Sequence, residues 1–203
     1  PVMAHAQATD GIKNAVRAGI RSVEHGVFLD DEAIGMMLDA GTWLVPTLLA
    51  PLAALEAVAA GVGLPDSVAA KAREVIDVHR ESFAQAVRAG VRIAMGTDSG
   101  VAPHGRNLEE LALMAAGGMK PADVLAATTS SAAGLLGLAD TTGTVAPGKR
   151  ADLVVVDGDP YDFDGLKERI RAVYQDGRCV RGGGAGAGAG AGAAPGGASA
   201  APA

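Results

Sequence analysis

Residues 90–100 read Gly90-Val91-Arg92-Ile93-Ala94-Met95-Gly96-Thr97-Asp98-Ser99-Gly100, a short apolar run that ends at a carboxylate between glycines. An apolar run of this length is typical of a strand that is buried on both faces, as in a parallel sheet. Asp98 would then follow the carboxyl end of that strand, which is where barrels of alternating strands and helices place their chemistry. An isolated Asp beside Gly more often caps a turn, so equivalent positions elsewhere in the chain must decide between the two interpretations.

The same arrangement of strand and polar residue occurs twice earlier in the chain. Strands are predicted at 2–6, which contains His5, and at 20–23, which leads into Glu24-His25-Gly26. Helices that each end in Ala-Gly just before the next strand are predicted at 10–18, 31–40 and 66–89. This recurrence indicates βα units with parallel strands. Because the carboxyl ends of parallel strands meet at one edge, we expect His5, His25 and Asp98 to lie together.

The rest of the chain divides into three predicted parts. Residues 1–139 contain the βα units, including a strand at 42–48, a helical insertion at 49–63, and helices at 108–116, where Asn107 and Glu110 form a capping box, and at 121–136. Residues 140–181 form a small β unit, with strands at 143–145, 151–157 and 170–174 and a hairpin signal at Asp176-Gly177. Residues 182–203 contain only Gly, Ala, Pro and Ser, a composition that predicts a disordered tail.

Length and composition narrow the class of protein. The 203 residues carry about four βα units, whereas a complete eight-stranded barrel typically needs about 250 residues. The net charge is −6 and the sequence has no basic cluster, so it lacks the positive charge that nucleic-acid binding requires. No apolar run reaches the length of about 18 residues that a membrane span needs. One cysteine excludes an internal disulfide. The start at Pro1, without signal-peptide features, predicts a cytoplasmic protein whose sequence continues upstream.

Two imidazoles and a carboxylate at one edge of a sheet are suitable ligands for a divalent metal ion. Such an ion lowers the pKa of bound water to about 7 and so makes it a nucleophile for hydrolysis. The opposing interpretation is that each His is a hydrogen-bonded structural group, which is common for a single His at a strand end. The equivalent positions of His5 and His25 in consecutive units favour the metal site.

Other polar residues have open roles. His104 and Arg106 follow Asp98 on the same loop and could contact substrate, although both could equally be solvent groups. His79 lies within a predicted helix, among charged residues, and is assigned a solvated or packing role. Glu24 could orient an imidazole, but strand alternation relative to His25 predicts that it points into the helix layer.

Four motifs, in this order, give the chain a family resemblance. They are Val-Met-Ala-His-Ala at 2–6, Ser-Val-Glu-His-Gly at 22–26, Gly-Thr-Asp-Ser-Gly at 96–100 and Gly-Thr-Val-Ala-Pro-Gly-Lys-Arg-Ala-Asp-Leu-Val-Val at 143–155. Together they resemble the amidohydrolase superfamily, and within it the imidazolonepropionase-related branch that includes Xaa-Pro dipeptidases. The resemblance implies an α/β fold, the C-terminal half of a (β/α)8 TIM barrel (strands 5–8) plus part of a small β-sandwich. His5 would lie on strand five, His25 on strand six and Asp98 on strand eight.

The resemblance also implies an activity, the hydrolysis of C–N bonds in amides, cyclic amides or dipeptides. His5 and His25 would bind one divalent metal, Zn²⁺ foremost, with Mn²⁺, Fe²⁺ and Co²⁺ also suited to these ligands. Asp98 would bind a second metal or its bridging hydroxide and act as general base and then general acid. In single-metal members, the residue equivalent to His25 instead positions the substrate.

Part of the family's metal site is absent from this sequence. The family's His-x-His on strand one and its strand-four lysine precede anything present here, so the resemblance implies that this chain alone is inactive and requires the N-terminal half of the barrel. A different hypothesis is a non-catalytic half-barrel subunit or pseudoenzyme. Such a chain would act through partner association, or as a homo-oligomer, at its exposed strand edges.

Overall fold

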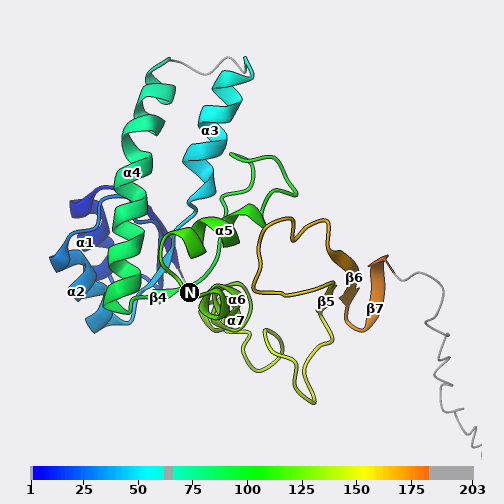
Figure 1. Cartoon of the computed structure of the whole chain (residues 1–203). Coiled ribbons are helices and arrows are strands. Elements are labelled where there is room, and N and C mark those ends of the chain that lie inside the picture. The colour runs from blue at the N-terminus through cyan, green and yellow to red at the C-terminus, as the bar shows by residue number, and fades with distance from the viewer. Residues whose placement is uncertain (1, 62–65, 183–203) are drawn as a thin grey trace, which may run out of the picture.

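The computed structural model describes residues 2–61 and 66–182, which form two sheets and seven helices (Figure 1). The strands of the first sheet are parallel and pair in sequence order: β1 (Met3–Ala6), β2 (Ser22–His25), β3 (Trp43–Val45) and β4 (Arg92–Ile93). The second sheet is antiparallel and consists of β5 (Leu153–Val156), β6 (Ile170–Gln175) and β7 (Arg178–Gly182). The predicted combination of parallel βα units and a small β unit is therefore confirmed.

The helices follow the predicted segments closely. They are α1 (Thr9–Arg17), α2 (Asp31–Ala40), α3 (Leu49–Ala59), α4 (Asp66–Ala89), α5 (Glu109–Ala116), α6 (Pro121–Thr128) and α7 (Ser130–Leu136). In Figure 1, α1, α2 and α4 lie beside the parallel sheet, and α5, α6 and α7 lie between it and the antiparallel sheet. No helix in 2–61 or 66–182 is long and apolar enough to cross a bilayer.

Glycines end the helices that precede strands, as the sequence predicts. Gly19, Gly41 and Gly90 have φ values of 78°, 62° and 84°, a left-handed conformation that glycine adopts without the steric cost of a Cβ. Each lets the chain leave its helix and enter the sheet in the same direction as the strand before.

The parallel sheet has one face covered by helices and one that is more open. Val23 and Leu44, which are paired in register, are buried in the main core with residues of α1, α2 and α4. Ser22 and Glu24 point to the opposite face, where the Ser22 hydroxyl donates to Glu24 Oε1 at 2.6 Å. His5 is level with Glu24 and therefore shares this second face.

Some elements differ from the prediction. The strand that leads to Asp98 is short, since only Arg92 and Ile93 pair with β3. The predicted helix 121–136 is broken at Thr129, which has φ −124° and ψ −88°. Thr128 and Thr129 use their hydroxyls to bond carbonyls four residues back, which bends helices and explains the break.

The C-terminal region also differs in part. Residues 143–145 form no strand, whereas the predicted hairpin at Asp176-Gly177 is confirmed, with φ values of 53° and 78° at the two turn residues. The predicted disorder of 182–203 lies outside the described residues except at Gly182, which ends β7. Residues 62–65, which include the end of the predicted insertion, also lie outside the described residues.

Candidate functional site

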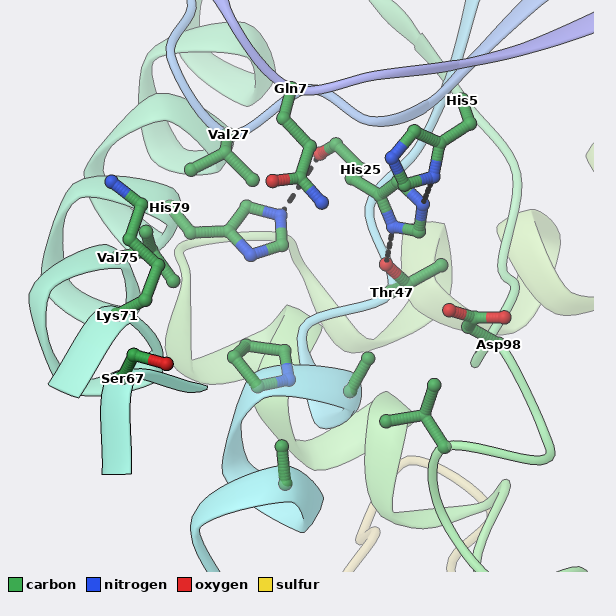
Figure 2. A pocket seen from close by; sticks show the side chains of 14 residues that line it. His5, Gln7, His25, Val27, Thr47, Ser67, Lys71, Val75, His79 and Asp98 are labelled. Atoms are coloured by element: carbon green, nitrogen blue, oxygen red, sulfur yellow. Dashed lines mark hydrogen bonds between the residues drawn. The ribbon is translucent and has the colours of Figure 1, made fainter. Parts of the chain in front are cut away.

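A cavity of about 580 Å³ lies at the carboxyl ends of the parallel strands, between the sheet and helices α3 and α4 (Figure 2). Its polar lining includes His5, Gln7, His25, Thr47, His79 and Asp98. Its apolar lining includes Val27, Ala50, Pro51, Ala54, Val75 and Val101. Barrels of this construction carry their active sites at this end of the strands.

His5 and His25 lie in contact at one side of the cavity. They come from the adjacent strands β1 and β2, and His5 Nδ1 lies 2.7 Å from His25 Nε2. Their ring centroids are 4.4 Å apart and the rings are inclined by 72°. At this distance one nitrogen carries a hydrogen and donates it to the other, so the two ring nitrogens face the same point.

Asp98 lines the same cavity but stands apart from the imidazole pair (Figure 2). Within residues 2–61 and 66–182, no group of three or more His, Cys, Asp or Glu side chains is close enough to hold a metal ion. The structure thus brings the three predicted metal ligands to one cavity, with His5 and His25 touching and Asp98 beyond contact distance. Their role as ligands stays a prediction.

The backbone is strained at three cavity residues. Among the described residues, the non-glycine residues with positive φ are His25, Thr47, Asp98 and Asp176, and the first three line the cavity. The left-handed conformation costs about 1–2 kcal/mol per non-glycine residue. Strain of this kind clusters at functional sites, where the surrounding structure holds it in place.

Burial and charge tune the ionisation of the site. Burial, aided by the nearby His5, lowers the pKa of His25, although the Asp98 carboxylate opposes this. The lowered pKa of His25 favours the neutral imidazole, the state in which an imidazole binds metal. Burial also raises the pKa of Glu24, with a smaller contribution from the negative charge of Asp98.

The predicted orientation of Glu24 toward the helix layer is wrong. Glu24 shares a face with His5 because the two are in register on neighbouring strands. The prediction assumed regular alternation through His25, but His25 has a φ of 74° and departs from strand geometry. Alternation therefore fails at the residue from which the orientation was inferred.

The two predicted substrate residues lie away from the cavity lining. Arg106 makes ion pairs with Glu56 of α3 and, at 2.6 Å, with Glu109 of α5, so its guanidinium joins two helices. His104 is exposed on the loop after Asp98. Neither is among the described residues that line the cavity, and substrate contact by either stays a prediction.

Sequence reasoning missed the contribution of α4 and of the end of β3. His79, assigned a solvated or packing role, is buried and places Nε2 2.9 Å from the His25 carbonyl oxygen. Thr47 is buried beside His25. Thr47 lies near the carboxyl end of the strand predicted at 42–48, and His25 and Asp98 lie at the carboxyl ends of theirs, so this common position was the signal available.

The residues present fit part of a divalent metal site. His5 and His25 offer converging nitrogens and Asp98 offers carboxylate oxygen, the donor types that Zn²⁺ accepts. A complete catalytic zinc site typically has three protein side chains bound to the ion. The described residues therefore supply a partial set, which further ligands would have to complete.

The fold and site place the chain in a known family. The family model for the amidohydrolase family matches residues 1–181, and the chain belongs to this family. The curated relatives include ochratoxinase from Aspergillus niger, which is 31% identical over 188 residues, or 90% of this chain and 38% of that protein. Imidazolonepropionase from Geobacillus kaustophilus is 32% identical over 71% of this chain and 30% of its own length.

Solved structures agree with this assignment. A Xaa-Pro dipeptidase with bound methionine in its active site matches with a TM-score of 0.83 and 36% identity, over 89% of this chain and 45% of the dipeptidase. A prolidase complexed with N-methylphosphonate-L-proline matches with a TM-score of 0.82 and 33% identity over 90% of this chain. The chain thus corresponds to about half of these structures and to less than half the length of the curated relatives named above.

Proposed function

We propose that this chain is the carboxyl-terminal half of a metal-dependent amidohydrolase barrel, strands five to eight, whose complete form hydrolyses C–N bonds. His5 and His25 hold a divalent ion, Zn²⁺ foremost, and Asp98 is the catalytic acid and base. The observation that carries the proposal is the contact between His5 Nδ1 and His25 Nε2, at the carboxyl ends of adjacent parallel strands, in the cavity that Asp98 also lines.

The proposed chemistry divides between the ion and the protein. A bound divalent ion supplies a water of lowered pKa. Asp98 accepts the proton from that water as it attacks the carbonyl carbon, and returns the proton to the leaving nitrogen as the C–N bond breaks. This proton transfer needs one group that accepts a proton and then donates it. A carboxylate at the cavity, such as Asp98, can do both.

The cavity lining supports a substrate with an apolar group beside the scissile amide. Val27, Val75 and Val101 contribute apolar side chains to the cavity lining. Lys71 of α4 is the one Lys or Arg among the described lining residues and suits a substrate carboxylate, as a dipeptide would offer. Lys71 makes one long ion pair, with Glu74 at 3.8 Å, whereas Arg106 pairs with two carboxylates of the chain.

The test uses assembly of two halves. The chain is mixed with a separately produced amino-terminal half-barrel of the Xaa-Pro dipeptidase, loaded with Zn²⁺, and assayed with dipeptides that have apolar residues. We expect the complex to retain about one or two ions and to hydrolyse the amide. Asp98→Asn should abolish hydrolysis and leave part of the metal bound, and Asp123→Asn, on the exposed first turn of α6, is the matched control.

A second candidate function is a non-catalytic subunit that binds partners through its strand edges. The open face of the parallel sheet and the unpaired edge of β1 favour it, since Met3, on that face, is 66% exposed. A stable complex of the two halves that binds metal but hydrolyses no amide would support this function. A complex that binds no metal at all would overturn the proposed hydrolase.

A further inference from the structure

Thr47 occupies a backbone conformation that its residue type disfavours. It follows β3 and Pro46, has a φ of 52° and is 3% exposed. A β-branched residue in the left-handed region is a pronounced outlier, and glycine would adopt the same backbone without the cost. The side chain of Thr47 must therefore provide something that offsets the strain.

The Thr47 hydroxyl contacts His25. Thr47 Oγ1 lies 2.7 Å from His25 Nδ1, and both residues are buried (Figure 2). The other ring nitrogen of His25, Nε2, faces His5. Thr47 thus holds the ring on the side opposite to the imidazole contact and fixes which edge of the ring points toward His5.

The backbone of His25 is held separately by α4. His79 Nε2 lies 2.9 Å from the carbonyl oxygen of His25. Because a carbonyl oxygen only accepts, His79 Nε2 must carry hydrogen and donate it. This bond fixes the strained backbone of His25, at φ 74°, while Thr47 fixes the ring.

We propose that Thr47 is a positioning residue for His25. Its hydroxyl accepts the hydrogen on His25 Nδ1, and this leaves Nε2 unprotonated, with its lone pair directed to the point that His5 also faces. In the chain without a cation, Nε2 accepts the hydrogen of His5 Nδ1. The use of this lone pair for a divalent cation rests on the proposed function, but the protonation pattern of the ring does not.

The experiment reads the tautomer directly. Imidazole ¹⁵N long-range correlation spectra are recorded for the full chain without metal at about pH 8, where an ordinary imidazole is neutral. We expect His25 to carry hydrogen on Nδ1. Thr47→Ser keeps the hydroxyl and should preserve this pattern, whereas Thr47→Val keeps the shape, removes the acceptor and should shift His25 toward hydrogen on Nε2.

A matched control is available at the other end of β3. Thr42 is 2% exposed and its hydroxyl donates to the Ile20 carbonyl at 3.4 Å, so Thr42→Val also removes a buried hydroxyl. It should leave the His25 pattern unchanged. A Zn²⁺ titration of the same proteins, each assembled with the amino-terminal half-barrel that supplies the remaining ligands, should show affinity weakened roughly 10- to 100-fold by Thr47→Val and little changed by Thr47→Ser and Thr42→Val.

The outcomes separate the two proposals. Hydrogen on Nε2 of His25 in the unmodified chain, or an unchanged pattern in Thr47→Val, overturns the role of Thr47 whatever zinc does. The expected tautomers without any zinc binding by the complex of the two halves would support Thr47 as the positioning residue and contradict the proposed metal site. If Thr47→Val fails to fold by circular dichroism, the unmodified chain and Thr47→Ser still decide, because the role of Thr47 requires Nδ1 hydrogen in both.

Discussion

At the scale of single residues, Gly26 shows how closely the backbone approaches its neighbours around the site. It follows His25 directly and has a φ of 62°. A Cβ placed on Gly26 would lie 2.6 Å from Cδ1 of Leu44, a residue of the core. Glycine is therefore favoured here by its conformation, and a Cβ would in addition require the buried Leu44 side chain to shift.

We predict that Gly26→Ala destabilises the chain by about 2–4 kcal/mol, from the overpacking against Leu44 and the strained φ together. Gly35→Ala is the matched control. Gly35 lies inside α2 with no heavy atom within 4 Å of the added Cβ, so the change should stabilise the chain by about 0.5–1 kcal/mol. Urea denaturation followed by circular dichroism measures both, and equal effects of the two changes would contradict the interpretation.

At the scale of elements, the sequence predicted Glu110 in a capping box with Asn107, and this prediction is wrong. The helix α5 begins at Glu109 without a side-chain cap. Glu110 is fully buried and accepts hydrogen bonds from the backbone N–H groups of Leu48 and Leu49, at 2.7 and 2.8 Å. It joins α5 to the start of α3, which carries part of the cavity wall.

This contact makes stability depend on pH. Burial raises the pKa of Glu110 to about 7, although the two backbone donors oppose the shift. The folded state therefore binds a proton more tightly than the unfolded state, where the pKa is ordinary. The stability that this proton provides is fully present below about pH 4.5 and is lost as the pH rises through about 7.

We predict that Glu110→Gln, which cannot ionise, removes this part of the pH dependence. Between about pH 4.5 and 7 the unfolding free energy of the unmodified chain should fall relative to that of the variant. Denaturant titrations across this range provide the measurement. Glu168→Gln, at an exposed position, is the control, and its unfolding free energy should change with pH as that of the unmodified chain does. If the unfolding free energy of Glu110→Gln also changes in this way, the buried carboxyl is not the cause.

At the scale of the whole molecule, the parallel sheet has an unpaired edge and an open face. Among the described strands, β1 pairs with β2 alone. Met3 shares the face of His5, two residues away, and is 66% exposed. An exposed apolar residue on an unpaired strand edge favours association with other chains.

We predict that the chain on its own self-associates as its concentration rises, and that Met3→Lys weakens this association. A lysine at a strand edge opposes edge-to-edge pairing. Sedimentation velocity over a range of concentrations measures the effect. Leu136→Lys, which changes a similarly exposed apolar residue at the end of α7, is the control, and an equal reduction by both variants would rule out the β1 edge as the interface.

Local patterns in the sequence were sufficient for the βα units, the Ala-Gly helix ends, the Asp176-Gly177 hairpin and the motifs that place the chain in the amidohydrolase family. These features depend on neighbouring residues, through helix capping, turn conformation and hydrophobic period. The sequence also predicted that His5, His25 and Asp98 lie at one edge, because parallel strands share a direction, and all three line the same cavity.

The way the site is held depends on contacts between distant parts of the chain. The contacts of His25 with Thr47 and His79 join residues 22 and 54 positions apart, and those of Glu110 span about 60. Left-handed backbone at His25, Thr47 and Asp98 is stable only because packing and such distant hydrogen bonds offset its cost. No local pattern encodes that balance, since each residue alone prefers another conformation.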